Sequence, residues 1–108
     1  MRIVSGEYKG RIFSPPKSIK ARPTTDIAKE GLFNIINNSF NFEDIVVLDL
    51  FSGTGSISFE FASRGCRSIH LVEMNFTHFQ FIRKIQQELN FTQIVPIRRS
   101  EEHTSELQ

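Results

Sequence analysis

The chain has 108 residues with a formal net charge of +1 at pH 7, and 39% of its residues are hydrophobic and 23% charged. This composition is typical of one small globular domain, and no apolar run is long enough to cross a membrane or to act as a signal peptide. A single cysteine, Cys66, excludes an intrachain disulfide, and no His, Cys, Asp or Glu spacing indicates a metal site. We expect a cytoplasmic protein without a membrane partner.

The charge is distributed unevenly. Residues 1–22 hold six basic residues and one acid, a net charge of +5, whereas residues 99–108 carry −2. A basic segment on a globular domain indicates a polyanionic partner, although a solvated basic face produces the same pattern.

The first part of the chain predicts a hairpin and a helix. Residues 2–5 and 11–13 read as short strands joined by a turn at Gly10, and a proline-rich loop follows. The helix begins near Thr25 or Asp26, either of which can cap it, and ends at residues 37–39. Its apolar face is predicted from helical spacing to contain Ile27, Gly31, Leu32, Ile35 and Ile36.

The remaining chain predicts three strands and two helices in alternation. Residues 45–51 are almost continuously apolar, which is typical of a strand buried on both faces. A helix over residues 57–64, ended by Gly65, and a strand over 69–73 follow. We interpret Cys66 as a packing residue and His70 as a core or interface histidine.

A second amphipathic helix, residues 76–90, precedes a third strand over 94–97. His78 is predicted to lie on its exposed side. Pro96 lacks an N–H, so the third strand fits best at an edge of the sheet. The alternation of strands and helices predicts an α/β fold with a parallel sheet.

A glycine-containing turn, Asp49-Leu50-Phe51-Ser52-Gly53-Thr54-Gly55, joins the first of these strands to its helix. Its glycines allow a close approach of the backbone to a ligand, and the N–H groups at the helix start favour an anionic group. A phosphate loop would need Lys and Ser or Thr after the last glycine, and a dinucleotide loop would need a third glycine where Phe51 stands. S-adenosylmethionine fits better, because the loop amides can bind its carboxylate and Asp49 can face its amino group.

Glu73 ends the next strand, 18 residues after Gly55. A carboxylate at this place can accept both ribose hydroxyls of a nucleoside, although a solvated acid is common at a strand end. The glycine turn and Glu73 on consecutive strands together predict binding of a nucleoside cofactor.

Two blocks, Tyr8-Lys9-Gly10-Arg11 and Arg22-Pro23-Thr24-Thr25-Asp26, are more distinctive than the glycine turn. With these blocks the chain closely resembles the bacterial 16S ribosomal RNA guanine-N2 methyltransferase family, from residue 1 to about residue 98. The other matching residues are Met1-Arg2-Ile3, Gly6, Leu32-Phe33-Asn34-Ile35, Leu48-Asp49-Leu50-Phe51-Ser52-Gly53-Thr54-Gly55 and Ser63-Arg64-Gly65.

The resemblance implies a Rossmann-like class I methyltransferase fold with an added N-terminal hairpin. It also implies S-adenosylmethionine as cofactor, methyl transfer to the exocyclic amine of a guanine, and a monomeric full-length enzyme acting on 16S rRNA or a small-subunit assembly intermediate. Glu73 would hold the ribose and Met74 would lie beside the adenine. The methionine end of the cofactor would be held by Asp49, Phe51, Ser52, Gly53, Thr54 and Gly55. Lys9, Arg11 and Arg22 would face RNA phosphates. Thr24 and Thr25 would lie near the reacting groups.

The chain departs from the family in one respect. The Asn/Asp-Pro-Pro-Tyr/Phe motif, which in this family receives the target amine after the fourth strand, is absent: Pro15-Pro16 lies between Ser14 and Lys17. No catalytic residue is therefore assigned, and we expect this chain by itself to be inactive. The alternatives are a methyltransferase of DNA adenine or another RNA, and a noncatalytic binding module or fragment.

These observations divide the chain into three parts. Residues 1–26 form the basic, RNA-facing hairpin segment, and residues 27–98 form a cofactor-binding domain truncated after its third strand. In the family's strand order, the strand at residues 45–51 would then have an unpaired apolar edge, which favours aggregation. We interpret residues 99–108 as the translation of a sequencing-library adapter, with a disordered tail as the alternative.

Overall fold

A computed structural model describes residues 1–19, 24–50 and 52–99. The predicted site residues Arg22 and Phe51 lie outside these ranges, as does all of the 99–108 segment except Arg99. The elements in chain order are α1 (Asp26–Ser39), η1 (Phe42–Asp44), β1 (Val46–Asp49), α2 (Ser56–Ser63), β2 (Ser68–Glu73), α3 (Phe76–Glu88) and β3 (Ile94–Arg98).

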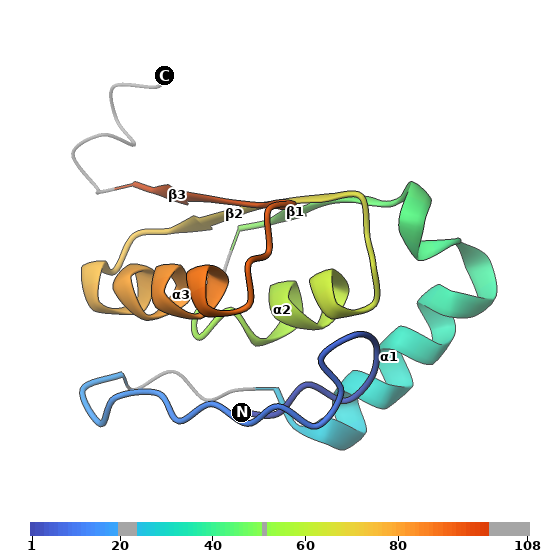
Figure 1. Cartoon of the computed structure of the whole chain (residues 1–108), viewed down its shortest axis with the longest axis horizontal. Coiled ribbons are helices and arrows are strands. Elements are labelled where there is room, and N and C mark those ends of the chain that lie inside the picture. Colours follow the sequence, from blue (N-terminus) through green and yellow to red (C-terminus); the bar gives the residue numbers. More distant parts are fainter. Residues whose placement is uncertain (20–23, 51, 100–108) are drawn as a thin grey trace.

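The three strands form one parallel sheet in the order β1-β2-β3, which confirms the predicted α/β class. Helices α2 and α3 lie on the same face of this sheet, and the N-terminal segment lies beyond them on the side away from the strands (Figure 1). When each new strand is added on the same side of the previous one, two crossover connections of the same hand place their helices on one face of the sheet. The core forms between this face and the helices, and includes Ile69, Leu71, Phe59, Ile82 and Ile85.

The opposite face of the sheet is open in the described part of the chain. Val46 and Leu48 are 61% and 64% exposed, and His70 is also exposed. The prediction that residues 45–51 are buried on both faces is therefore wrong, because no described helix covers this side. The exposure of His70 contradicts a core position, whereas the alternative prediction of an interface histidine stays a prediction. Among the strands of the described residues, β1 and β3 lie at the two edges of the sheet. This confirms the edge position predicted from Pro96 for β3 and the unpaired edge predicted for the strand at residues 45–51.

The N-terminal hairpin is formed by one antiparallel bridge, between Arg2 and Ile12. Its arms also pair through the N–H of Ile3, which donates to Arg11 O at 3.0 Å, and through the N–H of Phe13, which donates to Met1 O at 2.8 Å. The predicted pairing is thus confirmed, whereas the two regular strands predicted around it are not formed.

Helix α1 begins and ends as predicted. Thr25 caps it, since its Oγ1 accepts from the N–H of Ala28 at 3.2 Å. The predicted apolar face is wrong in part: Ile27 and Ile35 are 84% and 67% exposed, whereas Ile36 is half-buried and packs against the core. The buried residues of the helix are Lys29 and Phe33. The reason is that Lys29 Nζ lies beside the buried Glu60 carboxylate and donates to Arg2 O, so the face of the helix that carries Lys29 points toward α2.

Helix α2 is followed by Gly65 at a φ of +89°, as expected for a residue that ends a helix. The Cys66 side chain after it is buried at 3% exposure, which confirms its interpretation as a packing residue. Burial raises the pKa of the Cys66 thiol to about 11, so the reactive thiolate is scarce near neutral pH.

We predict that Leu48→Lys reduces self-association of the chain, because a charge on an exposed edge strand opposes pairing with another strand. Ile35→Lys is the matched control, since Ile35 is equally exposed but lies on α1. Sedimentation velocity measures the self-association of both variants. An equal effect of the two variants would show that general apolar exposure, and not the β1 edge, causes the association.

We also predict that Cys66 in the native chain reacts slowly with a disulfide reagent at pH 8 and faster as the pH approaches about 11. The same chain in guanidinium provides the reference rate of an accessible thiol. A native rate at pH 8 equal to the denatured rate would contradict the burial of this side chain.

Candidate functional site

The glycine turn and Glu73 meet at the carboxyl edge of the sheet. Ser52 Oγ donates to Val72 O at 3.2 Å and lies 3.4 Å from Glu73 Oε2. The cause is the parallel register, in which Asp49 of β1 is the partner of Leu71 of β2, so both strands end at the same edge. The structure therefore brings together two groups that are about twenty residues apart in the chain.

The turn itself requires glycine. Gly53 and Gly55 have φ values of +54° and +80°, and the N–H of Gly55 donates to Ser52 O at 2.6 Å. A Cβ on Gly55 would lie 2.8 Å from Phe59 Cε2 and 3.1 Å from Ile82 Cγ1. Any side chain at Gly55 would thus be strained by its backbone conformation and would also disturb the packing of α2 against α3.

The start of α2 presents hydrogen-bond donors. Gly55 is its N-cap and has no side chain that could satisfy the first N–H groups of the helix. Ser56 Oγ is buried and has no hydrogen-bond partner within the described ranges. A helix start with this arrangement suits a carboxylate or another anionic group.

Asp49 and Glu73 are both held by neighbouring groups. Asp49 Oδ2 accepts from Ser58 Oγ at 2.7 Å, which links the end of β1 to α2. Glu73 Oε1 accepts from the N–H of Asn75 at 2.9 Å, and His78 Nδ1 lies 3.7 Å from Glu73 Oε2. The prediction that His78 lies on the exposed side of its helix is wrong, since its side chain is 16% exposed and faces this carboxylate.

The other predicted site residues are distributed around this edge and the hairpin. Met74 follows Glu73 and is 46% exposed. Thr54 is buried within the turn, and Thr24 is half-buried just before the capping residue Thr25. Lys9 and Arg11 are exposed on the hairpin. The contacts of these residues with cofactor, reacting groups or RNA stay predictions.

Sequence reasoning missed three residues of this region: Ser58 and Glu60 on α2, and Lys29 on α1. Ser58 and Glu60 lie in a helix whose residues are almost all buried. The polar residues between apolar neighbours were the sequence signal that could have indicated buried polar contacts. A buried charged side chain requires a partner, and the identity of that partner is visible only in the tertiary structure.

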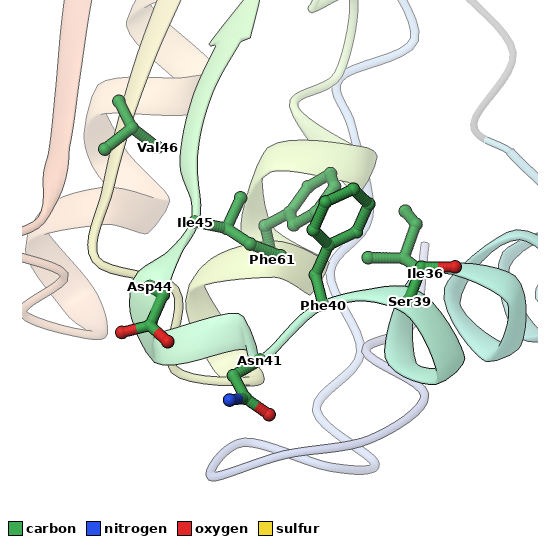
Figure 2. Close-up of a pocket in the computed structure, with 8 residues that line it drawn as sticks. All are labelled: Ile36, Ser39, Phe40, Asn41, Asp44, Ile45, Val46 and Phe61. Atoms are coloured by element: carbon green, nitrogen blue, oxygen red, sulfur yellow. The ribbon is translucent and has the colours of Figure 1, made fainter.

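A cavity of about 620 Å³ lies at the opposite, amino end of β1 (Figure 2). Its apolar lining comes from Ile36, Phe40, Ile45 and Phe61, and polar side chains stand at its rim. Ligands of open α/β sheets bind beyond the carboxyl ends of the strands, so we assign the candidate site to the glycine turn and not to this cavity.

Within residues 1–19, 24–50 and 52–99, no helix is long and apolar enough to span a membrane. The same residues contain no group of three or more His, Cys, Asp or Glu side chains that could hold a metal ion.

The family described as conserved hypothetical protein 95 matches residues 1–108. An uncharacterized methylase of Rickettsia prowazekii is 35% identical over 97 residues, covering 83% of this chain and 41% of that protein. Ribosomal RNA small subunit methyltransferase D of Buchnera aphidicola subsp. Baizongia pistaciae is 34% identical over 98 residues, covering 91% of this chain and 50% of that protein. The chain spans about half the length of these relatives or less.

The fold has a similar counterpart among solved structures. The candidate methyltransferase yhhF of Escherichia coli matches with a TM-score of 0.79 at 26% identity, over 93% of this chain and 52% of that chain. The arrangement of elements and the family match thus both agree with the resemblance inferred from the sequence. The chain belongs to the family described as conserved hypothetical protein 95, which includes the bacterial small-subunit ribosomal RNA methyltransferases.

Proposed function

We propose that this chain supplies the cofactor site and an RNA-contacting hairpin of an enzyme that methylates the exocyclic N2 of a guanine in 16S rRNA, with S-adenosylmethionine as methyl donor. The observation that supports this proposal most directly is the meeting of Ser52, Glu73 and the α2 start at one sheet edge. Membership of the family supports the class of reaction and of substrate.

The residues at this edge fit the proposed cofactor. Ser56 Oγ, which has no hydrogen-bond partner among the described residues, and the first amides of α2 would donate to its carboxylate. Asp49, whose Oδ2 accepts from Ser58 Oγ at the end of β1, would face its amino group. Glu73 would accept from the ribose hydroxyls, with Met74 beside the adenine. Ser52 and Asn75 hold the Glu73 carboxylate in place for this role.

When bound, the cofactor supplies a methyl group on a sulfonium, which is a good leaving group. The guanine base must then leave its stack in the RNA, so that its exocyclic amine can lie in line with the methyl group at near-attack distance. No residue of this chain matches the motif that performs this task in the family. The described residues would therefore bind and orient, and the catalytic contacts would come from elsewhere in the enzyme.

Lys9 and Arg11 on the hairpin, with Arg22 outside the described residues, are the proposed contacts with RNA phosphates. Thr24 and Thr25 are proposed to lie near the reacting groups. We further propose that the enzyme is a cytoplasmic monomer and that its substrate is 16S rRNA, free or in an assembling small subunit.

We predict that the 108-residue chain binds S-adenosylmethionine and that Glu73→Ala weakens this binding about tenfold to a hundredfold, because hydrogen bonds to a charged acceptor are lost. Isothermal titration calorimetry measures the affinity. Glu88→Ala, at the exposed end of α3, is the control and leaves the affinity unchanged. Binding by the Glu73→Ala variant as tight as by the parent chain would remove Glu73 from the site.

We predict that Lys9→Ala and Arg11→Ala each weaken binding of a guanine-containing RNA stem-loop and lower the slope of log affinity against log salt by about 1, because each removes one phosphate contact. Fluorescence anisotropy at several salt concentrations measures both quantities. Arg67→Ala, which removes an exposed arginine at the amino edge of the sheet, is the control. An equal loss in the control would indicate that net charge alone determines RNA binding.

A further inference from the structure

The N-terminal hairpin is attached to helix α2 through a buried carboxylate. Glu60 is 0% exposed, and its two oxygens accept from the N–H of Val4 at 2.8 Å and of Ser5 at 3.0 Å. The same carboxylate pairs with Arg64 Nε at 2.9 Å and lies 3.8 Å from Lys29 Nζ. One side chain of α2 thus binds both the backbone of the hairpin and the two cations around it.

A second set of bonds joins the tip of the hairpin to the end of α2. Ser63 O accepts from the N–H of Glu7 at 2.7 Å, and Ser63 Oγ accepts from the N–H of Tyr8 at 3.0 Å while donating to Ser5 O at 2.7 Å. The Tyr8 hydroxyl donates to Leu89 O at 2.8 Å, just beyond α3. The hairpin is therefore held at several points in one orientation on the helical layer.

Lys29 completes this arrangement. Its Nζ donates to Arg2 O at 2.6 Å, on the first arm of the hairpin. Burial lowers the pKa of Lys29, and the neighbouring Glu60 opposes this shift. Well-packed apolar residues often stabilise a fold as well as buried ion pairs do. A buried Glu and Lys that both bind hairpin backbone are better explained by the orientation that their hydrogen bonds impose.

Helix α2 carries both features of the proposed function. The glycine turn lies at its start, and Glu60 and Ser63 near its end hold the segment that bears Lys9 and Arg11. We propose that Glu60 and Ser63 are positioning residues, which hold the RNA-contacting hairpin in one orientation relative to the cofactor site so that RNA binds to a preorganised surface. This inference rests on the proposed function.

Two glycines of the hairpin provide a matched test. Gly6 and Gly10 have nearly equal φ values, +90° and +88°, so an alanine is similarly strained at either position. A Cβ on Gly6 would lie 2.0 Å from Ser63 O, whereas a Cβ on Gly10 would meet nothing within 4 Å. Gly6→Ala therefore displaces the hairpin from α2, and Gly10→Ala leaves it attached.

The experiment measures affinity for the RNA stem-loop and for S-adenosylmethionine, at submicromolar chain concentration, in the parent chain and both variants. We expect Gly6→Ala to weaken RNA binding about tenfold relative to Gly10→Ala, because a detached hairpin must be ordered on binding. Affinity for S-adenosylmethionine stays the same in all three. The salt slope of RNA binding also stays the same, because Lys9 and Arg11 are still present, and this distinguishes lost positioning from lost charge.

Glu60→Gln is the second variant, since an amide keeps the shape of the side chain but offers one acceptor oxygen where two N–H groups need one each. We expect faster hydrogen exchange at Val4 and Ser5 and the same selective loss of RNA affinity. Equal RNA affinity of Gly6→Ala and Gly10→Ala would overturn the inference. So would a parallel loss of RNA affinity, cofactor affinity and helical circular dichroism in Gly6→Ala. Failure of the parent chain to bind S-adenosylmethionine or RNA would instead contradict the proposed function.

Discussion

The parallel pairing of β1 with β2 is the constraint on which the candidate site depends. In this register Asp49 is the partner of Leu71, so the residues that follow each strand emerge at one edge. Ser52 and Glu73 consequently lie within 3.4 Å of each other, although neither is near the other in the chain. The crossover helix α2 then begins at the same edge, because a connection between two parallel strands must return along the sheet from the point where the first strand ends. The position of the proposed cofactor site is thus a consequence of topology.

Helix α2 connects this edge to the rest of the molecule. Ser58, one turn into the helix, donates to Asp49, while Glu60 and Ser63 face the opposite side and bind the N-terminal hairpin. Almost every residue of this helix is buried. Ser56 Oγ has no hydrogen-bond partner among the described residues, whereas the side chains of Ser58, Glu60 and Ser63 find inside the protein the hydrogen-bond partners that a buried polar group requires. The orientation of α1 follows from the same requirement, since Lys29 reaches inward to the Glu60 carboxylate and leaves Ile27 and Ile35 exposed.

The described residues cover the sheet on one face only. In doubly wound α/β folds, helices pack on both faces and further strands extend the sheet. Here Val46, Leu48 and Val95 remain exposed on the other face. These exposed side chains lie on the face that a second layer of helices covers in a doubly wound fold.

The sequence by itself determined the order of strands and helices, the edge position of β3 from Pro96, and the glycine turn followed by an acid one strand later. These features depend on local periodicity, on proline and glycine stereochemistry and on short spacings, which are all properties of neighbouring residues. Only the tertiary structure decided which face of α1 is buried, that His78 lies beside Glu73, and that Glu60 binds the hairpin backbone. These contacts join residues that are distant in the chain, or depend on which layers cover a sheet. Hydrophobic periodicity shows that a face is apolar, but it does not show whether a neighbouring layer is present to cover it.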